Sequence, residues 1–145
     1  MSSAEELADI ISQLFTHCQE KDARHVARYG VSIVESRCIR TLYEHKQLTV
    51  NQLAQKMSLT SGRVTRIIDG LVSKKRVVRE SDKTDRRIFN LTLTPKGEKL
   101  AENLVQDHIQ IHEEILSHIP SECQQSTIEL LKTLNDAIQN WLNTE

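Results

Sequence analysis

Apolar residues recur every three or four positions over most of this chain, which is the pattern of amphipathic helices. One such stripe occupies residues 4–21 and is followed by a polar, basic link. Two further stripes end the chain, one from Leu100 through about residue 118 and one from Ile128 to Leu142. Because a small central domain cannot cover the apolar faces of these helices, we expect them to bury one another across the two-fold axis of a homodimer.

Shorter helices are predicted between these stripes, because capping signals mark where they begin. In a capping box, Ser or Thr is followed three residues later by Glu or Gln, and each side chain satisfies a free backbone N–H group. Two such pairs mark helix starts between the stripes, Ser32 with Glu35 and Thr49 with Gln52. A sharp turn at residues 57–60 precedes another helix, which Thr60 or Ser61 can cap. The inner face of that helix is formed by Val64, Ile67, Ile68 and Leu71.

The pattern changes after this helix, from helical spacing to β-rich runs. Residues 77–79 and 88–93 are such runs, and the polar segment 80–87 separates them, which predicts a β-hairpin. Thr94 and Pro95 then resemble a helix cap followed by proline at the first helical position, where its missing N–H group costs nothing.

Together these elements predict a mainly α protein with a small β-hairpin wing. Two short capped helices joined by a tight turn and followed by a hairpin form a winged helix-turn-helix lobe, which we place at residues 32–94. A helical dimerisation region is expected on either side, at residues 1–31 and 95–145. With 145 residues, the chain is long enough for one domain, and we expect a single one covering residues 1–145.

The formal net charge of −1 hides a strong asymmetry along the chain. Residues 62–87 contain nine basic and four acidic side chains, so that segment has a local net charge of +5. A basic segment that coincides with a helix-turn-helix predicts binding to double-stranded DNA. The candidate contact residues lie at the start of the recognition helix and on the wing: Ser61, Arg63, Thr65, Arg66, Lys83, Asp85, Arg86 and Arg87.

The segment from Leu48 to Leu100 resembles the DNA-binding lobe of the MarR family. Asp85-Arg86-Arg87 matches that family's D-x-R pattern, and residues 91–97, from Leu91 to Gly97, match its L-x-L-T-x-x-G pattern. The resemblance implies a dimeric transcriptional regulator that binds a near-palindromic operator and acts as a ligand- or stress-responsive repressor. It also implies that Arg87 reaches the minor groove while Asp85 steadies the wing. Effectors in this family include small phenolic compounds, oxidants and metal ions.

Histidines and cysteines suggest competing sensor chemistries. His108 and His112 are four residues apart, so both imidazoles project from one helical face and can grip one metal ion. Resemblance to the zinc-sensing branch of the family implies that Glu20 and Cys38 join them. Alternatively, Cys38 is a small apolar residue of the core. Redox sensing through Cys18 or Cys38 is a third hypothesis, and it requires an accessible thiolate.

Several classes of protein are disfavoured by what the sequence lacks. No apolar run approaches eighteen residues and the amino terminus is acidic, so we expect a cytoplasmic protein without a membrane partner. Three cysteines, an odd number, favour reduced thiols over a disulfide framework. The sequence contains no G-x-S-x-G, glycine-rich phosphate loop or H-E-x-x-H motif, so no enzyme activity is expected. The remaining alternative is a winged helix that binds protein.

Overall fold

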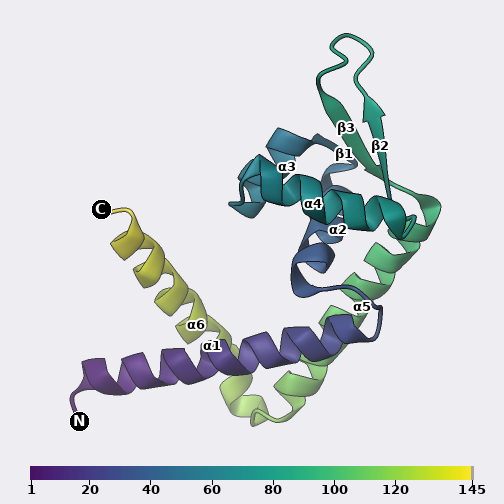
Figure 1. Ribbon diagram of the computed structural model, residues 1–145. Helices are drawn as coiled ribbons and strands as arrows, with labels where there is room; N and C mark the ends of the chain where they lie inside the picture. Colours follow the sequence, from purple (N-terminus) through teal and green to yellow (C-terminus); the bar gives the residue numbers. More distant parts are fainter. Residues whose placement is uncertain (145) are drawn as a thin grey trace. The chain divides into compact units, whose positions relative to one another are not determined.

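The computed structural model of the chain describes residues 1–144. These residues form six helices and a three-stranded sheet (Figure 1). In chain order, the elements are α1 (Ser3–Ala27), α2 (Ile33–His45), β1 (Gln47–Thr49), α3 (Val50–Met57), α4 (Ser61–Ser73), β2 (Val77–Ser81), β3 (Phe89–Leu93), α5 (Pro95–Ser117) and α6 (Ser121–Leu142). The chain forms two compact units, which divide between Asp107 and His108. The predicted fold class, mainly α with a β-hairpin wing, is confirmed.

Each predicted helix start in the lobe is present in the structure. Both predicted capping boxes form, at the start of α2 and at the start of α3. Thr60 is the cap of α4, because its Oγ1 accepts a hydrogen bond from the Arg63 N–H at 3.2 Å, and Ser61 is the first helical residue. At the start of α5, the Gly97 N–H donates to Thr94 Oγ1 at 3.0 Å, as expected from the Thr94-Pro95 pair.

The first helix is longer than predicted. We expected it to end near residue 21 and to be followed by a basic link, but α1 continues to Ala27. Arg24 and His25, which follow the predicted end of the helix, therefore belong to its last turns. His25 and Val26 are both buried, so the helix keeps its contact with the core although a polar residue interrupts the apolar pattern.

The wing belongs to an antiparallel sheet in which the strand order is β1-β3-β2. The hairpin of β2 and β3 was predicted, although its strands pair as far as Ser81 with Phe89, so the connecting tip is shorter than expected. Strand β1 was not predicted. It pairs Leu48 with Leu91 and attaches the hairpin to the segment that leads into α3.

One core holds α2, α3, α4, the sheet and the start of α5 together. Its fully buried side chains are Ile39, Leu42, Leu53, Ile68, Leu71, Leu91, Leu104, Val64 and Cys38. At the base of the wing, Gly97 of α5 approaches the backbone of Arg76 so closely that an added Cβ atom would lie 2.0 Å from the Arg76 carbonyl oxygen. The core and this close approach fix the base of the wing against α4 and α5.

Large apolar side chains remain exposed on the helices outside the lobe. On α1 they are Leu7, Ile10, Leu14 and Phe15, and on α6 they are Leu130, Leu131, Ile138, Trp141 and Leu142. No residue of α6 is buried within the single described chain. Across residues 1–144, no helix combines the length and the apolar character needed to cross a membrane.

Candidate nucleic-acid interface

Helices α3 and α4 are joined by a tight turn whose geometry is fixed by backbone hydrogen bonds. Ser58 adopts a left-handed conformation with φ 54°, and its N–H donates to the Gln55 carbonyl at 3.2 Å. The next N–H group, from Leu59, donates to the Ala54 carbonyl at 3.0 Å. Because Val64 and Ile68 are fully buried in the core, the opposite face of α4 is directed to solvent.

Three of the four predicted contact residues of α4 lie beside two different hollows. Arg63 and Arg66 are exposed and line an open hollow of about 560 Å³ next to the start of α2. Thr65 lines a second hollow, of about 310 Å³, on the side of the wing. The recognition helix therefore presents its two arginines to one flank and Thr65 to the other.

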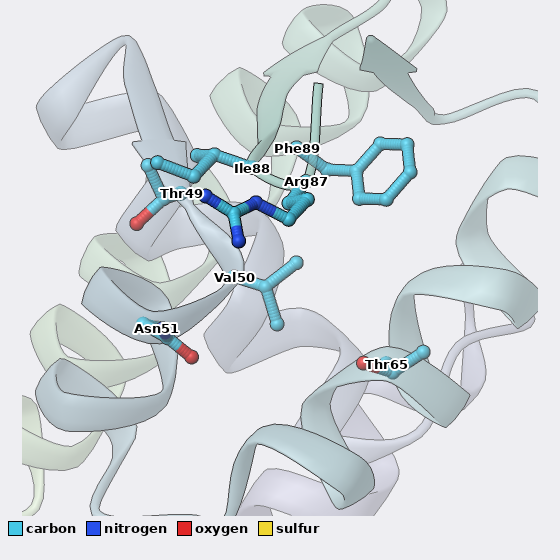
Figure 2. A pocket seen from close by; sticks show the side chains of 7 residues that line it. All are labelled: Thr49, Val50, Asn51, Thr65, Arg87, Ile88 and Phe89. Atoms are coloured by element: carbon cyan, nitrogen blue, oxygen red, sulfur yellow. The ribbon is translucent and has the colours of Figure 1, made fainter. Parts of the chain in front are cut away.

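The second hollow is where α3, α4 and the wing meet (Figure 2). Its lining residues come from these three elements and from the end of β1: Thr49, Val50, Asn51, Thr65, Arg87, Ile88 and Phe89. Figure 2 shows the guanidinium of Arg87 on the wing side and Thr65 on the side of α4. A cationic side chain thus borders the same hollow as the recognition helix.

The hydroxyl groups of the predicted contact residues are already used within the protein. Ser61 Oγ donates to Asn51 Oδ1 at 2.7 Å and so links α4 to α3. Thr65 Oγ1 donates to the Ser61 carbonyl at 2.9 Å. The exposed guanidinium groups of Arg63 and Arg66 are therefore better placed as hydrogen-bond donors to an external partner than Ser61 or Thr65.

On the wing, Asp85 holds Arg87 as the resemblance implied. Asp85 Oδ1 accepts hydrogen bonds from the Arg87 backbone N–H at 3.0 Å and from Arg87 Nε at 3.2 Å. The Arg87 side chain is nevertheless 92% exposed, so its terminal nitrogens face solvent. Lys83 and Arg86 are also exposed on the same tip. The wing thus carries three accessible cations at its end.

Two contributors to the wing were missed from the sequence. Asp82 accepts hydrogen bonds from three residues of the wing, and these bonds, led by those from Thr84, lower the pKa of its carboxyl group far below the usual range. Arg79 of β2 donates to Asp69 of α4 at 2.7 Å, and its guanidinium lies 5.6 Å from the centre of the Phe89 ring. An Asp two residues before a Thr is a turn signal that could have pointed to Asp82.

Part of the basic segment serves the fold. Lys74 Nζ donates to Glu35 at 3.0 Å and to the Gly30 carbonyl at 3.3 Å, and so ties the end of α4 to the start of α2. Arg79 is likewise paired with Asp69. The local net charge of +5 therefore overstates the number of cations that are available to a nucleic acid.

The four predicted zinc ligands lie in different environments, and zinc binding by them stays a prediction. Glu20 is paired with Arg24 on α1, and Cys38 is fully buried in the core. His108 and His112 lie on one face of α5, with ring centres 4.4 Å apart. Among residues 1–144, no three His, Cys, Asp or Glu side chains are grouped so that they could hold a metal ion. The interpretation of Cys38 as a core residue is confirmed.

The environments of the cysteines also bear on redox sensing. Burial, with a smaller contribution from Glu35, raises the pKa of the Cys38 thiol to about 12. A thiol that is both buried and protonated is a poor target for oxidants. Cys18 is partly buried on α1, and its role in redox sensing stays a prediction.

Comparisons with known proteins agree with this geometry. A sequence model of the MarR family matches residues 31–89. The HTH-type transcriptional regulator MhqR of Bacillus subtilis (strain 168) is 26% identical over 123 residues, which cover 85% of this chain and 85% of that protein. The HTH-type transcriptional repressor MdtR of the same organism is 28% identical over 126 residues, which cover 84% of this chain and 81% of that protein.

A solved structure gives the same result for the fold. The crystal structure of Streptococcus pneumoniae FabT in complex with DNA superposes with a TM-score of 0.80 at 21% identity, covering 96% of this chain and 99% of that chain.

Proposed function

We propose that this chain is a winged helix-turn-helix transcriptional regulator of the MarR family, whose sequence model matches residues 31–89, and that it binds a near-palindromic double-stranded operator as a homodimer. It is a transcriptional regulator and not an enzyme. The observation that carries the proposal is the placement of cations on two neighbouring elements. Arg63 and Arg66 are exposed near the start of α4, and Arg87 is held by Asp85 on the wing beside it.

This placement suits the two grooves of B-DNA. A major groove about 12 Å wide admits an α-helix, and arginine can form paired hydrogen bonds with the O6 and N7 atoms of guanine. We therefore assign Arg63 and Arg66 to base contacts in the major groove. The narrower minor groove of A·T-rich DNA has a strongly negative potential that attracts arginine, and we assign Arg87 to it.

The proposed homodimer rests on the exposed apolar side chains of α1 and α6. Leu14 and Phe15 are 44% and 63% exposed, and Leu131 and Ile138 are 48% and 42% exposed. Exposed apolar side chains gathered on one helix mark an interaction surface, and a second copy of the chain offers the same surfaces. A two-fold dimer predicts two half-sites separated by one helical turn, roughly 34 Å.

We further propose that the protein acts as a repressor that a ligand or stress signal releases from DNA. Support comes from its relative MdtR, which is named a transcriptional repressor.

The experiment that tests the proposal compares two arginine variants on duplexes selected from a random pool by the wild-type protein. Arg66→Ala should cost about 1 to 3 kcal/mol of binding free energy and relax the preference at particular base pairs. Arg87→Ala should weaken binding to all selected sites, lower the salt dependence and erase a preference for A·T-rich flanks.

Arg24→Ala is the matched control, because it removes the same charge from an exposed site on α1. It should leave the affinity and the base preference close to those of the wild type. Equal losses for all three variants would show that only net charge matters, and the assignment of the two grooves would be wrong.

A further inference from the structure

The tip of the wing has to keep its shape without an apolar core. Strands β2 and β3 pair only as far as Ser81 and Phe89, and residues 82–88 close the hairpin beyond them. This tip extends away from α3 and α4 in Figure 1. The tip carries Lys83, Arg86 and Arg87, the cations that we assign to contacts with DNA. If the tip were disordered in the free protein, binding to DNA would have to order it, and this ordering would cost conformational entropy.

One carboxylate organises this tip. Asp82 Oδ1 accepts hydrogen bonds from the Thr84 backbone N–H at 2.8 Å, from Thr84 Oγ1 at 2.6 Å and from the Asp85 N–H at 3.3 Å. Asp82 Oδ2 accepts from Asn90 Nδ2 at 3.0 Å, across the hairpin on β3. The backbone completes the closure, because the Asp82 N–H donates to the Ile88 carbonyl at 2.8 Å.

These bonds connect Asp82 to the DNA-facing arginine through one intermediate residue. Asp82 holds the backbone of Asp85, and Asp85 in turn holds both the backbone N–H and Nε of Arg87. The geometry points to Asp82 as the positioning residue of the wing: its carboxylate pre-organises the tip so that Arg87 is presented to DNA in one orientation. This inference rests on the proposed function.

Electrostatics alone predicts the opposite effect of removing Asp82. A carboxylate near the DNA-facing surface repels phosphates, so its loss should tighten binding if charge were its only contribution. Pre-organisation predicts weaker binding, because the ordering of residues 82–88 would then have to occur on the DNA. The sign of the change therefore separates the two explanations.

The experiment measures dissociation constants on one duplex, selected from a random pool by the wild-type protein. Asp82→Ala should weaken binding about tenfold, the equivalent of one hydrogen bond to a charged group. Glu80→Ala is the matched control, since it removes the same charge from an exposed position of the same hairpin, and its binding should be unchanged or tighter.

Two further variants separate hydrogen bonding from charge. Asp82→Asn keeps an acceptor for Thr84 and Asp85, and a flipped Asn90 amide can accept from the new amide group, so binding should stay within about threefold of wild type. Thr84→Val removes one donor to Asp82 without any change of charge. It should weaken binding in the same direction as Asp82→Ala, by a smaller factor.

A double-mutant cycle then tests whether Asp82 acts through Arg87. In the Arg87→Ala background, Asp82→Ala should cause little further loss of binding affinity. The urea unfolding midpoint of the Asp82→Ala protein should equal that of the wild type, because the tip lies outside the core. Asp82→Ala binding as tightly as Glu80→Ala, or an undiminished loss in the Arg87→Ala background, would overturn the inference. If Arg87→Ala weakens binding but Asp82→Ala does not, only this inference fails. If the wild-type protein enriches no duplex, the proposed function fails with it.

Discussion

Replacing Gly97 with alanine should destabilise the protein although alanine is the better helix former. The added Cβ would lie 2.0 Å from the Arg76 carbonyl oxygen, 3.0 Å from the Arg76 carbonyl carbon and 3.3 Å from Leu93 Cδ2. The Arg76 carbonyl cannot retreat freely, because it accepts a hydrogen bond from the Thr94 N–H at 3.0 Å. Relief of the clash therefore requires a shift of α5 against the base of the wing.

The magnitude follows from two opposing effects. Overpacking a well-packed site costs about 1 to 3 kcal/mol and sometimes more, and a contact this short with backbone atoms belongs at the upper end. Glycine to alanine in a helix returns about 0.5 to 1 kcal/mol. We expect Gly97→Ala to lower the free energy of unfolding by about 2 kcal/mol or more.

Urea unfolding at a fixed protein concentration measures this difference, and the concentration is held constant because the stability of the proposed dimer depends on it. Gly62→Ala and Gly70→Ala in α4 are the controls, since an added Cβ at either position meets no atom within 4 Å. Both should be neutral or stabilising by up to about 1 kcal/mol. If Gly97→Ala is as stable as these controls, the reasoning from the close approach is refuted.

Three other outcomes are expected. Iodoacetamide should alkylate exposed Cys123 in the native protein well before buried Cys38, whose thiol pKa is about 12, and equal rates by mass spectrometry would contradict the burial. Ile138→Asp should weaken association in sedimentation, because it places a charge on the proposed dimer surface, and an unchanged dimer would exclude that surface. Asp69→Ala removes the acceptor of Arg79 and so breaks the link between α4 and β2, which should weaken duplex binding although a negative charge is lost. Tighter duplex binding would show that this link is dispensable.

The sequence predicted those parts of the fold that are specified by neighbouring residues. A capping box lies within four residues, so the starts of α2 and α3 could be placed from Ser32 and Thr49 alone. Strand β1 could not be predicted in this way, because three residues are too few to show an alternating pattern. Its Leu48 pairs with Leu91, which lies far along the chain. The end of α1 was misplaced since His25 is polar yet buried, which only tertiary contacts reveal.

In the site, too, features specified by neighbouring residues were predicted, and features that depend on tertiary packing were not. Arg87 and Asp85 were found because they stand two residues apart in a recognisable pattern, and the structure joins them by hydrogen bonds. The engagement of Ser61 with Asn51 depends on how α3 packs on α4, which spacing does not encode. Zinc ligation by Glu20 was inferred from the resemblance to the zinc-sensing branch and stays a prediction, whereas its pairing with Arg24 follows a local four-residue spacing.

The most direct test of the account is a selection from random duplexes followed by a salt titration of the selected duplex. The two-fold symmetry of the proposed homodimer predicts a near-palindromic consensus with half-sites roughly 34 Å apart. Neutralising about six or more phosphates per dimer predicts a loss of about a thousand-fold in affinity between 50 and 200 mM salt. An affinity that does not change with salt, or a selection that yields no symmetric sequence, would contradict the assignment of α4 and the wing as a DNA-binding surface.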